Sequence, residues 1–160
     1  MRFVWFVTFL PRDQRAYRTN YLCILLPIQE LNRCSLSLLC RLSFDTEASV
    51  ERGRRIIDMY KGMGVGKERV LIKLAATWEG ILAAEILEKE GIQCNLTLIF
   101  SVVQAIACAQ RGSHLISPFP GRILDWNKVK EGRTEGVNPE DDEGVVAVKA
   151  MYDYYKVRTQ

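Results

Sequence analysis

Three short apolar runs, at residues 70–74, 94–100 and 114–119, alternate with stretches that have the apolar spacing of amphipathic helices. The runs start 24 and 20 residues apart (at 70, 94 and 114), which leaves room for one helix between each pair. Strands that alternate with helices at this spacing are typical of βαβ units, in which the strands lie parallel. The pattern therefore predicts an α/β protein built on a parallel sheet.

Local signals place the remaining elements around these strands. A strand is expected over residues 41–44, and Ser49 is expected to cap the helix that follows it. Thr77 should cap a helix that Gly91 ends, and Ser101 should open the next helix. Later in the chain the sequence indicates a helix that begins near Leu124, a loop over 131–143 and a last helix over 144–156.

Two architectures share this alternation, the doubly wound open sheet and the (β/α)8 barrel. No GxGxxG or Walker motif follows any predicted strand, although doubly wound nucleotide-binding folds use such a loop. Polar residues stand inside the apolar runs toward the strand ends where barrels carry their active sites: Lys73, Asn95, Thr97 and Ser117. We therefore expect a partial (β/α)8 TIM barrel, because a full barrel takes ~250 residues and the regular part supplies about four strands.

The chain changes character near residue 40. Before it, apolar runs and polar clusters alternate without a clear period, so we predict an atypical N-terminal segment over 1–40 and a partial barrel domain over 41–160. Two apolar runs, at 1–10 and 21–28, are shorter than the ~20 residues needed to cross a bilayer. A Pro-Arg-Asp sequence follows the first run without a small-residue cleavage site, which favours an unusual leader over a secretory signal.

Composition argues against several classes of function. The net charge of +3 is small and the Lys and Arg residues are scattered, so nucleic acid is not expected as a partner. The five cysteines form no CxxC pair and the chain has one histidine, so a zinc site of ordinary spacing is not expected. An odd number of thiols, three of them in apolar runs, fits reduced cysteines in the cytoplasm.

Lys73 is unusual because it stands in the middle of an apolar run, VLIKL, and lysine is almost never fully buried without a partner. One interpretation is a lysine at a strand end whose stem packs on the sheet and whose ammonium reaches water. The other is a catalytic amine, because an apolar pocket disfavours the charged form and leaves a nucleophile that can form a Schiff base. The residues alone leave both open.

The other candidate residues have structural alternatives as well. Asn95 and Thr97 lie two apart on one strand and so point to the same side, either as the polar end of a barrel layer or as ligands for a hydroxylated substrate or a catalytic water. Arg122 follows a Pro- and Gly-rich stretch that is either a stiff loop or a site for a substrate phosphate. His114 starts a strand, away from the expected chemistry, and is interpreted as structural.

Several segments, in order and with their spacing, resemble the transaldolase family. They are LSFD (42–45), LIKLAATWEGI (71–81), CNLTLIFS (94–101), QAIACA (104–109) and LISPFPGRILDW (115–126), within a resemblance that covers residues 41–156. The resemblance implies a (β/α)8 barrel of the non-oxidative pentose phosphate pathway that uses no metal or organic cofactor. It also implies transfer of a dihydroxyacetone unit from sedoheptulose 7-phosphate to glyceraldehyde 3-phosphate.

The resemblance also assigns roles residue by residue. Lys73 matches the Schiff-base lysine, Asn95 the residue that contacts the bound dihydroxyacetone unit, and Thr97 the residue that helps position the catalytic water. The remaining matches are two substrate-pocket residues, Ser117 and Phe119, and a phosphate-binding arginine, Arg122. The implied partners are sugar phosphates and, as an open expectation, a second copy of the chain.

Other positions depart from the family. The family's glutamate, four residues before the arginine that matches Arg41, is replaced by Ser37, and its acidic proton shuttle near the first strand has no counterpart here. Pro120 stands where a small aliphatic residue is usual, and a further phosphate-binding arginine is missing. Because losing one positioned acid or base typically costs a factor of 10²–10⁴, we expect a truncated or alternatively spliced form with little or no activity.

Two alternatives stay open at this stage. The chain could be a non-catalytic fragment that serves as an interaction module or is an unstable product. It could also be an aldolase that uses free dihydroxyacetone, which the phosphate-binding Arg122 does not exclude.

Overall fold

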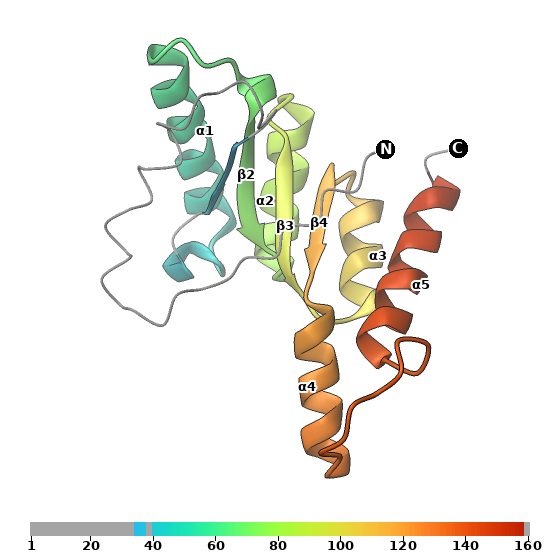
Figure 1. Ribbon diagram of the computed structural model, residues 1–160. Helices are drawn as coiled ribbons and strands as arrows, with labels where there is room; N and C mark the ends of the chain where they lie inside the picture. Colours follow the sequence, from blue (N-terminus) through green and yellow to red (C-terminus); the bar gives the residue numbers. More distant parts are fainter. Residues whose placement is uncertain (1–33, 38–39, 159–160) are drawn as a thin grey trace. The chain divides into compact units, whose positions relative to one another are not determined.

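A four-stranded parallel sheet is the centre of the fold. The computed structural model describes residues 34–37 and 40–158, which belong to one compact unit. The strands are hydrogen-bonded in chain order (Figure 1): β1 (Cys34–Ser37), β2 (Val70–Ala75), β3 (Cys94–Ile99) and β4 (Leu115–Pro118). The prediction of parallel strands alternating with helices is confirmed. Most of the N-terminal segment expected over 1–40 lies outside the described residues.

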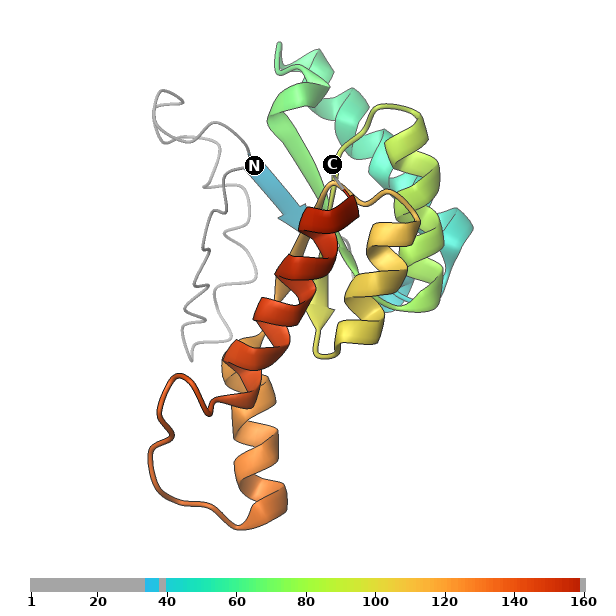
Figure 2. The same cartoon turned by 90° about the vertical axis from the view of Figure 1, so that its right-hand side faces the viewer.

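Helices connect the strands and cover the sheet. In chain order they are α1 (Thr46–Gly62), α2 (Trp78–Lys89), α3 (Val102–Gln110), α4 (Pro120–Glu131) and α5 (Glu143–Arg158). Figure 2 shows α1, α2 and α3 on the same side of the sheet. Among the described residues, no helix is both long and apolar enough to span a bilayer.

Two helix starts follow the capping signals in the sequence. The Thr77 hydroxyl accepts a hydrogen bond of 3.0 Å from the Gly80 N–H at the start of α2, and the Ser101 hydroxyl accepts one of 3.3 Å from the Gln104 N–H at the start of α3. After α2, Gly91 adopts a φ of +73°, a left-handed conformation that glycine takes without a Cβ clash. These predictions are confirmed. Caps and helix ends depend on residues that are close together in the sequence, so the sequence alone could indicate them.

Two expectations near the start of the described chain are wrong. Residues 40–42 form a 3-10 helix instead of contributing to a strand over 41–44, and the strand β1 ends before it. The cap of α1 is Asp45, whose carboxylate accepts a 2.9 Å hydrogen bond from the Ala48 N–H. Ser49 is instead buried inside α1, and its hydroxyl donates to the Leu42 carbonyl.

The core lies between the sheet and the helices that cover it. Ile72 on β2 and Leu87 on α2 are fully buried. Both approach Gly53 on α1, where an added Cβ would lie 2.9 Å from the Leu87 Cδ1 atom and 3.7 Å from the Ile72 Cγ2 atom. The absence of a side chain at Gly53 therefore lets α1 pack closely against α2 and β2.

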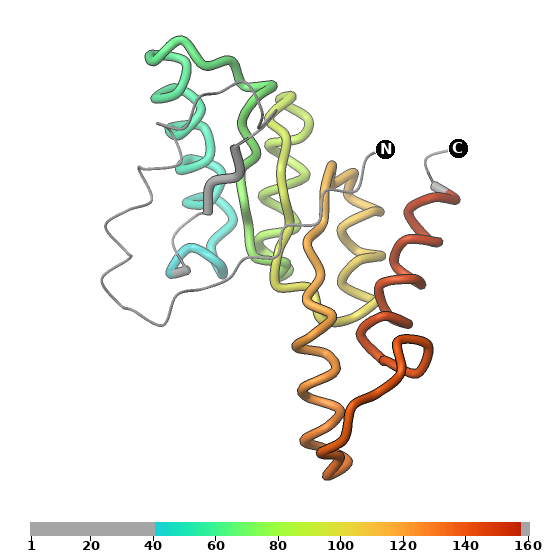
Figure 3. The backbone as a smooth tube through the Cα atoms, in the orientation of Figure 1, coloured from blue at the N-terminus to red at the C-terminus, as the bar shows by residue number. Residues whose placement is uncertain are grey.

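The last two helices pack against each other. Figure 3 traces the loop that joins α4 to α5, and α5 packs against both α3 and α4. Arg133, in this loop, forms ion pairs with Glu131 and Glu143. The sequence predicted that α4 would begin near Leu124, but it begins at Pro120, because proline fits the first helical position, where no N–H is needed.

Candidate active site

The ladder of the sheet brings the polar residues of the apolar runs together. Ser37, Lys73 and Asn95 are Cα partners across β1, β2 and β3. Thr97, two residues further along β3, is the Cα partner of Ser117 on β4. Partners in a ladder and residues two apart on a strand point to the same face. Backbone register thus places all five positions on one face, toward the C-terminal ends of the strands.

This face is the one turned away from the covering helices. Ile72 points at α1 and α2, as its contact with the Gly53 position shows, so the next residue, Lys73, points to the opposite side. The side chains on the helix side of β2, such as Val70 and Leu74, are buried in the core. The lysine is therefore partly buried without being part of the core.

Burial lowers the pKa of the Lys73 ammonium below the usual range of lysine, because a less polar environment disfavours the charged form. Among the described residues no carboxylate pairs with it, so no opposite charge counteracts this effect. Leu71, two residues earlier on the same face, is buried and adds apolar surface. The result is an amine with a larger neutral fraction than an exposed lysine has.

Asn95 and Ser117 are joined directly. The Ser117 hydroxyl donates a 2.7 Å hydrogen bond to the Asn95 Oδ1 atom, and Asn95 is buried. The Thr97 hydroxyl, which lies on the same face, is also buried and has no hydrogen-bond partner among the described residues. Buried polar groups are nearly always hydrogen-bonded in native proteins, so a hydrogen-bond partner is expected for the Thr97 hydroxyl.

Phe119 and Arg122 stand beyond the sheet, where β4 passes into α4. Phe119 is the N-cap residue of α4, and its backbone N–H donates a 3.1 Å hydrogen bond to the Ile99 carbonyl at the end of β3. Its ring lies 5.8 Å from the ring of Phe100, centroid to centroid. Arg122 is exposed in the first turn of α4. The structure thus places these two residues at the same end of the sheet as the polar cluster.

A β-bulge distorts β3 immediately after Thr97. Thr97 pairs with Ser117 and Ile99 with the next residue of β4, so Leu98 is an extra residue. Leu98 has a φ of +60°, a conformation that costs a residue with a Cβ roughly 1–2 kcal/mol. Sequence reasoning missed this bulge, because CNLTLIF contains no glycine and its one asparagine, Asn95, lies three residues before the left-handed position.

Among the described residues, the amine is the best nucleophile on the polar face. Burial raises the pKa of the Cys94 thiol, and it raises that of Cys108 to about 12, so neither provides a thiolate near neutral pH. The described residues also hold no group of three His, Cys, Asp or Glu side chains that could bind a metal ion. His114 lies at the opposite ends of the strands, where its backbone N–H donates to Glu88.

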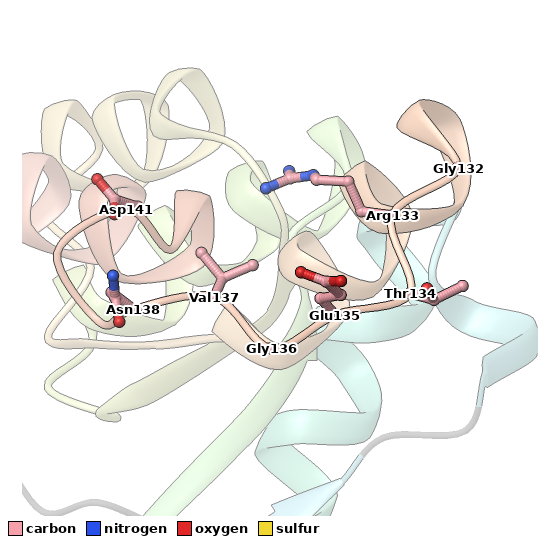
Figure 4. Close-up of a pocket in the computed structure, with 8 residues that line it drawn as sticks. All are labelled: Gly132, Arg133, Thr134, Glu135, Gly136, Val137, Asn138 and Asp141. Carbon is pink, nitrogen blue, oxygen red and sulfur yellow. The ribbon is translucent and has the colours of Figure 1, made fainter.

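A cavity of about 490 Å³ lies elsewhere, in the loop between α4 and α5. Figure 4 shows that its lining residues come from this one loop, residues 132–141. Its cation, Arg133, is paired with Glu131 and Glu143, so the cavity offers no unpaired positive charge to an anion. None of the residues predicted for catalysis or binding lines it.

Known proteins are similar in sequence to most of this chain. The model of the transaldolase/fructose-6-phosphate aldolase family matches residues 19–160, and so begins inside the segment for which the sequence alone showed no resemblance. The transaldolase of Aeromonas salmonicida is 60% identical over 124 residues, which are 78% of this chain and 39% of the relative. The transaldolase of Marinobacter nauticus is 63% identical over 116 residues, which are 72% of this chain and 36% of the relative.

A third relative, the transaldolase of Prochlorococcus marinus, is 59% identical over 124 residues, covering 78% of this chain and 37% of its own length. The chain therefore spans less than two fifths of the length of these curated relatives. The matching part contains the strands β2, β3 and β4 that carry the polar face, since the family match runs from residue 19 to 160. The chain belongs to the transaldolase/fructose-6-phosphate aldolase family.

Proposed function

We propose that Lys73 forms a Schiff base with a ketose phosphate and that the chain carries out transaldolase-type transfer of a dihydroxyacetone unit. The observation that supports this proposal is a partly buried lysine of lowered pKa, in register with Asn95 and on one face with Thr97 and Ser117. A neutral amine attacks a ketone, and loss of water gives an iminium ion that accepts electrons from a neighbouring carbon–carbon bond.

In the proposed reaction the donor is sedoheptulose 7-phosphate. The Lys73 amine displaces the ketone oxygen as water, and the bond between the third and fourth carbons breaks as its electron pair moves to the iminium. A base removes the hydroxyl proton of the fourth carbon, erythrose 4-phosphate leaves, and an enamine of dihydroxyacetone stays on the lysine. The enamine attacks the aldehyde carbon of glyceraldehyde 3-phosphate, and hydrolysis releases fructose 6-phosphate and the free amine.

The other residues have binding roles in this proposal. Asn95, held by the Ser117 hydroxyl at 2.7 Å, contacts the hydroxyls of the dihydroxyacetone unit, and Thr97 positions the water that is lost and regained. Phe119 forms part of the pocket wall at the start of α4. Arg122, exposed one turn further, binds the substrate phosphate, for which the planar guanidinium group is well suited.

We further propose that turnover by this chain is slow. The family's glutamate is replaced by Ser37, which the register places directly beside Lys73. Without a carboxylate there, proton transfer during imine formation and hydrolysis relies on solvent, and the expected cost is about 10²–10⁴-fold. The pathway proposed for the reaction is the non-oxidative pentose phosphate pathway in the cytoplasm, where the buried thiols Cys94 and Cys108 stay reduced.

A second candidate function is an aldolase reaction on free dihydroxyacetone, because the matching family also includes fructose-6-phosphate aldolase. In that case the enamine forms from dihydroxyacetone itself, without a ketose phosphate as donor. A third candidate is a non-catalytic interaction module, which the serine at position 37, beside Lys73, favours over a complete set of proton-transfer groups. These alternatives differ in which carbonyl compound, if any, adds to Lys73.

Borohydride trapping tests the proposal. The purified chain is incubated with fructose 6-phosphate or with dihydroxyacetone, reduced, digested and examined by mass spectrometry for an adduct on the Lys73 peptide. We expect an adduct on Lys73 that disappears in Lys73→Met and persists in a control variant of an exposed lysine, Lys61→Met. An adduct with dihydroxyacetone alone would favour the aldolase. A folded chain without any adduct would leave the interaction module.

A further inference from the structure

One side chain, Gln104 in the first turn of α3, connects the ends of two strands of the site. Its Oε1 atom accepts hydrogen bonds from the Phe100 N–H at 3.0 Å and from the Ser101 hydroxyl at 3.4 Å. Its Nε2 atom donates to the Ala76 carbonyl at 3.1 Å and to the Leu98 carbonyl at 3.2 Å. Ala76 immediately follows β2, and Leu98 is the bulge residue of β3.

Helix capping explains only half of these contacts. Ser101 and Gln104 have the spacing of a capping box, in which the side chain three residues into the helix reaches back to a backbone N–H. The Oε1 contacts serve that purpose. The Nε2 contacts do not, because both acceptors lie outside the helix, at the ends of β2 and β3. The two carbonyls require a donor and the Phe100 N–H requires an acceptor, so the amide has one orientation that satisfies all partners.

The contacts meet where β2 and β3 leave the site. The Ala76 N–H donates a 2.7 Å hydrogen bond to the Thr97 carbonyl, so Ala76 is held to β3 through its N–H and to Gln104 through its carbonyl. The bulge at Leu98 turns its carbonyl toward Gln104 immediately after Thr97. Gln104 therefore holds the end of β2 and the backbone of β3 immediately after Thr97.

We propose that Gln104 is a positioning residue: its Nε2 donors hold the Leu98 bulge and the end of β2, and so fix the Thr97 hydroxyl relative to the Lys73 amine. The catalytic part of this inference rests on the proposed Schiff-base function, whereas the structural part does not. Displacements of the order of 1 Å in such a site reduce rates by up to about 10²-fold.

The key variant is Gln104→Glu, which keeps an acceptor for the Phe100 N–H and the helix cap but removes both donors. The matched control is Ser101→Ala, which removes the capping hydroxyl and keeps the Gln104 donors. If Gln104 only caps the helix, Ser101→Ala should have the larger effect. If it positions Thr97, Gln104→Glu should have the larger effect.

The first readout needs no substrate. In full-length protein carrying labelled threonine methyl groups, nuclear magnetic resonance reports the chemical shift of the Thr97 methyl. We expect this signal to move or broaden in Gln104→Glu and to stay in place in Ser101→Ala. An unmoved signal in Gln104→Glu would overturn the proposal, whether or not the chain forms an imine. Should Gln104→Glu fail to fold, adding Leu98→Gly, which takes the left-handed conformation freely, is expected to restore the fold while the Thr97 signal still moves or broadens, because both donors are still missing; a Thr97 signal in its original place would overturn the proposal.

The second readout is the time course of borohydride-trapped adduct on Lys73 with fructose 6-phosphate. A group that positions the catalytic water changes the rate at which the adduct forms and not the final amount of adduct. We expect Gln104→Glu to slow adduct formation about 10- to 100-fold at an unchanged end point, and to have no further effect in a Thr97→Val background. A lowered end point, or additive effects of the two substitutions, would show a merely structural role. Absence of adduct in the unmodified chain would contradict the proposed function and leave the methyl signal to decide the role of Gln104.

Discussion

Replacing Ser37 by glutamate should speed up imine formation at Lys73. The two positions are Cα partners in the parallel ladder of β1 and β2. Adjacent strands are about 4.8 Å apart, so a glutamate side chain at position 37 reaches the amine or a water next to it. The substitution introduces the residue type that the resemblance to the transaldolase family implies at this place.

Two opposing effects set the size of the gain. A positioned carboxylate acting in proton transfer contributes about 10²–10⁴-fold. The same carboxylate also attracts the Lys73 ammonium by about 1.4 kcal/mol, a value between those of exposed pairs and of pairs close to the protein surface. That attraction raises the pKa of the lysine by about one unit and lowers the neutral amine about tenfold below that pKa. The gain from proton transfer is larger than this tenfold loss, and the net increase in the rate of imine formation is about 10- to 10³-fold.

The assay is the rate of borohydride-trapped adduct with fructose 6-phosphate, measured from neutral to alkaline pH. We expect the rate in Ser37→Glu, divided by the rate in the unmodified chain, to rise with pH. The smaller fraction of neutral amine in the variant no longer matters once Lys73 is deprotonated in both proteins. Ser35→Glu is the matched control: it lies on the same strand, two residues or roughly 6.6 Å before Ser37 along β1, and pairs with Leu71 instead of Lys73. An equal gain in the control, or no gain in a folded Ser37→Glu, would refute the reasoning.

Three further perturbations test the packing around the site. Leu87→Ala removes a fully buried side chain and should lower the free energy of unfolding in urea by about 2–5 kcal/mol, whereas Val129→Ala, at a residue 84% exposed, should change it by less than about 0.5 kcal/mol. Gly80→Ala would place a Cβ 2.1 Å from the Ala75 carbonyl oxygen, so we expect a loss of about 1–3 kcal/mol in the same measurement and less adduct on the adjoining strand. Because burial lowers the pKa of Lys73, the unfolded chain binds more protons between the two pKa values, and stability should rise with pH toward about 10.4; urea titrations should show this slope and its loss in Lys73→Met.

The sequence predicted the features that depend on neighbouring residues. The Thr77 and Ser101 caps are confirmed because each hydroxyl meets an N–H three residues later in the chain. The register that gathers Lys73 and Asn95 follows from parallel strands of similar length with polar residues at matching positions. Alternation along each strand then fixes which face they share.

Features that depend on distant contacts were not predictable. The chain around residues 42–43 forms a turn instead of a strand, and its carbonyls accept hydrogen bonds from the hydroxyls of Ser49 and Thr77, which are 7 and 34 residues away. The carbonyl of the bulge residue Leu98 likewise accepts a hydrogen bond from the side chain of Gln104, which lies on another element. The sequence contains the Ser101–Gln104 capping spacing, but that spacing does not reveal where the amide nitrogen of the glutamine points.

The spatial order of the strands has a consequence for how the chain is made. Because β1 to β4 neighbour one another in the order of synthesis, each strand leaving the ribosome finds the edge it pairs with already present. At about 5–20 residues per second, the stretch from Cys34 to Pro118 takes roughly 4–17 s to emerge, far longer than pairing and helix formation need. The Lys73 strand is complete before the strand of Asn95 and Thr97 exists, so the candidate site is assembled one strand at a time, in the order of the chain.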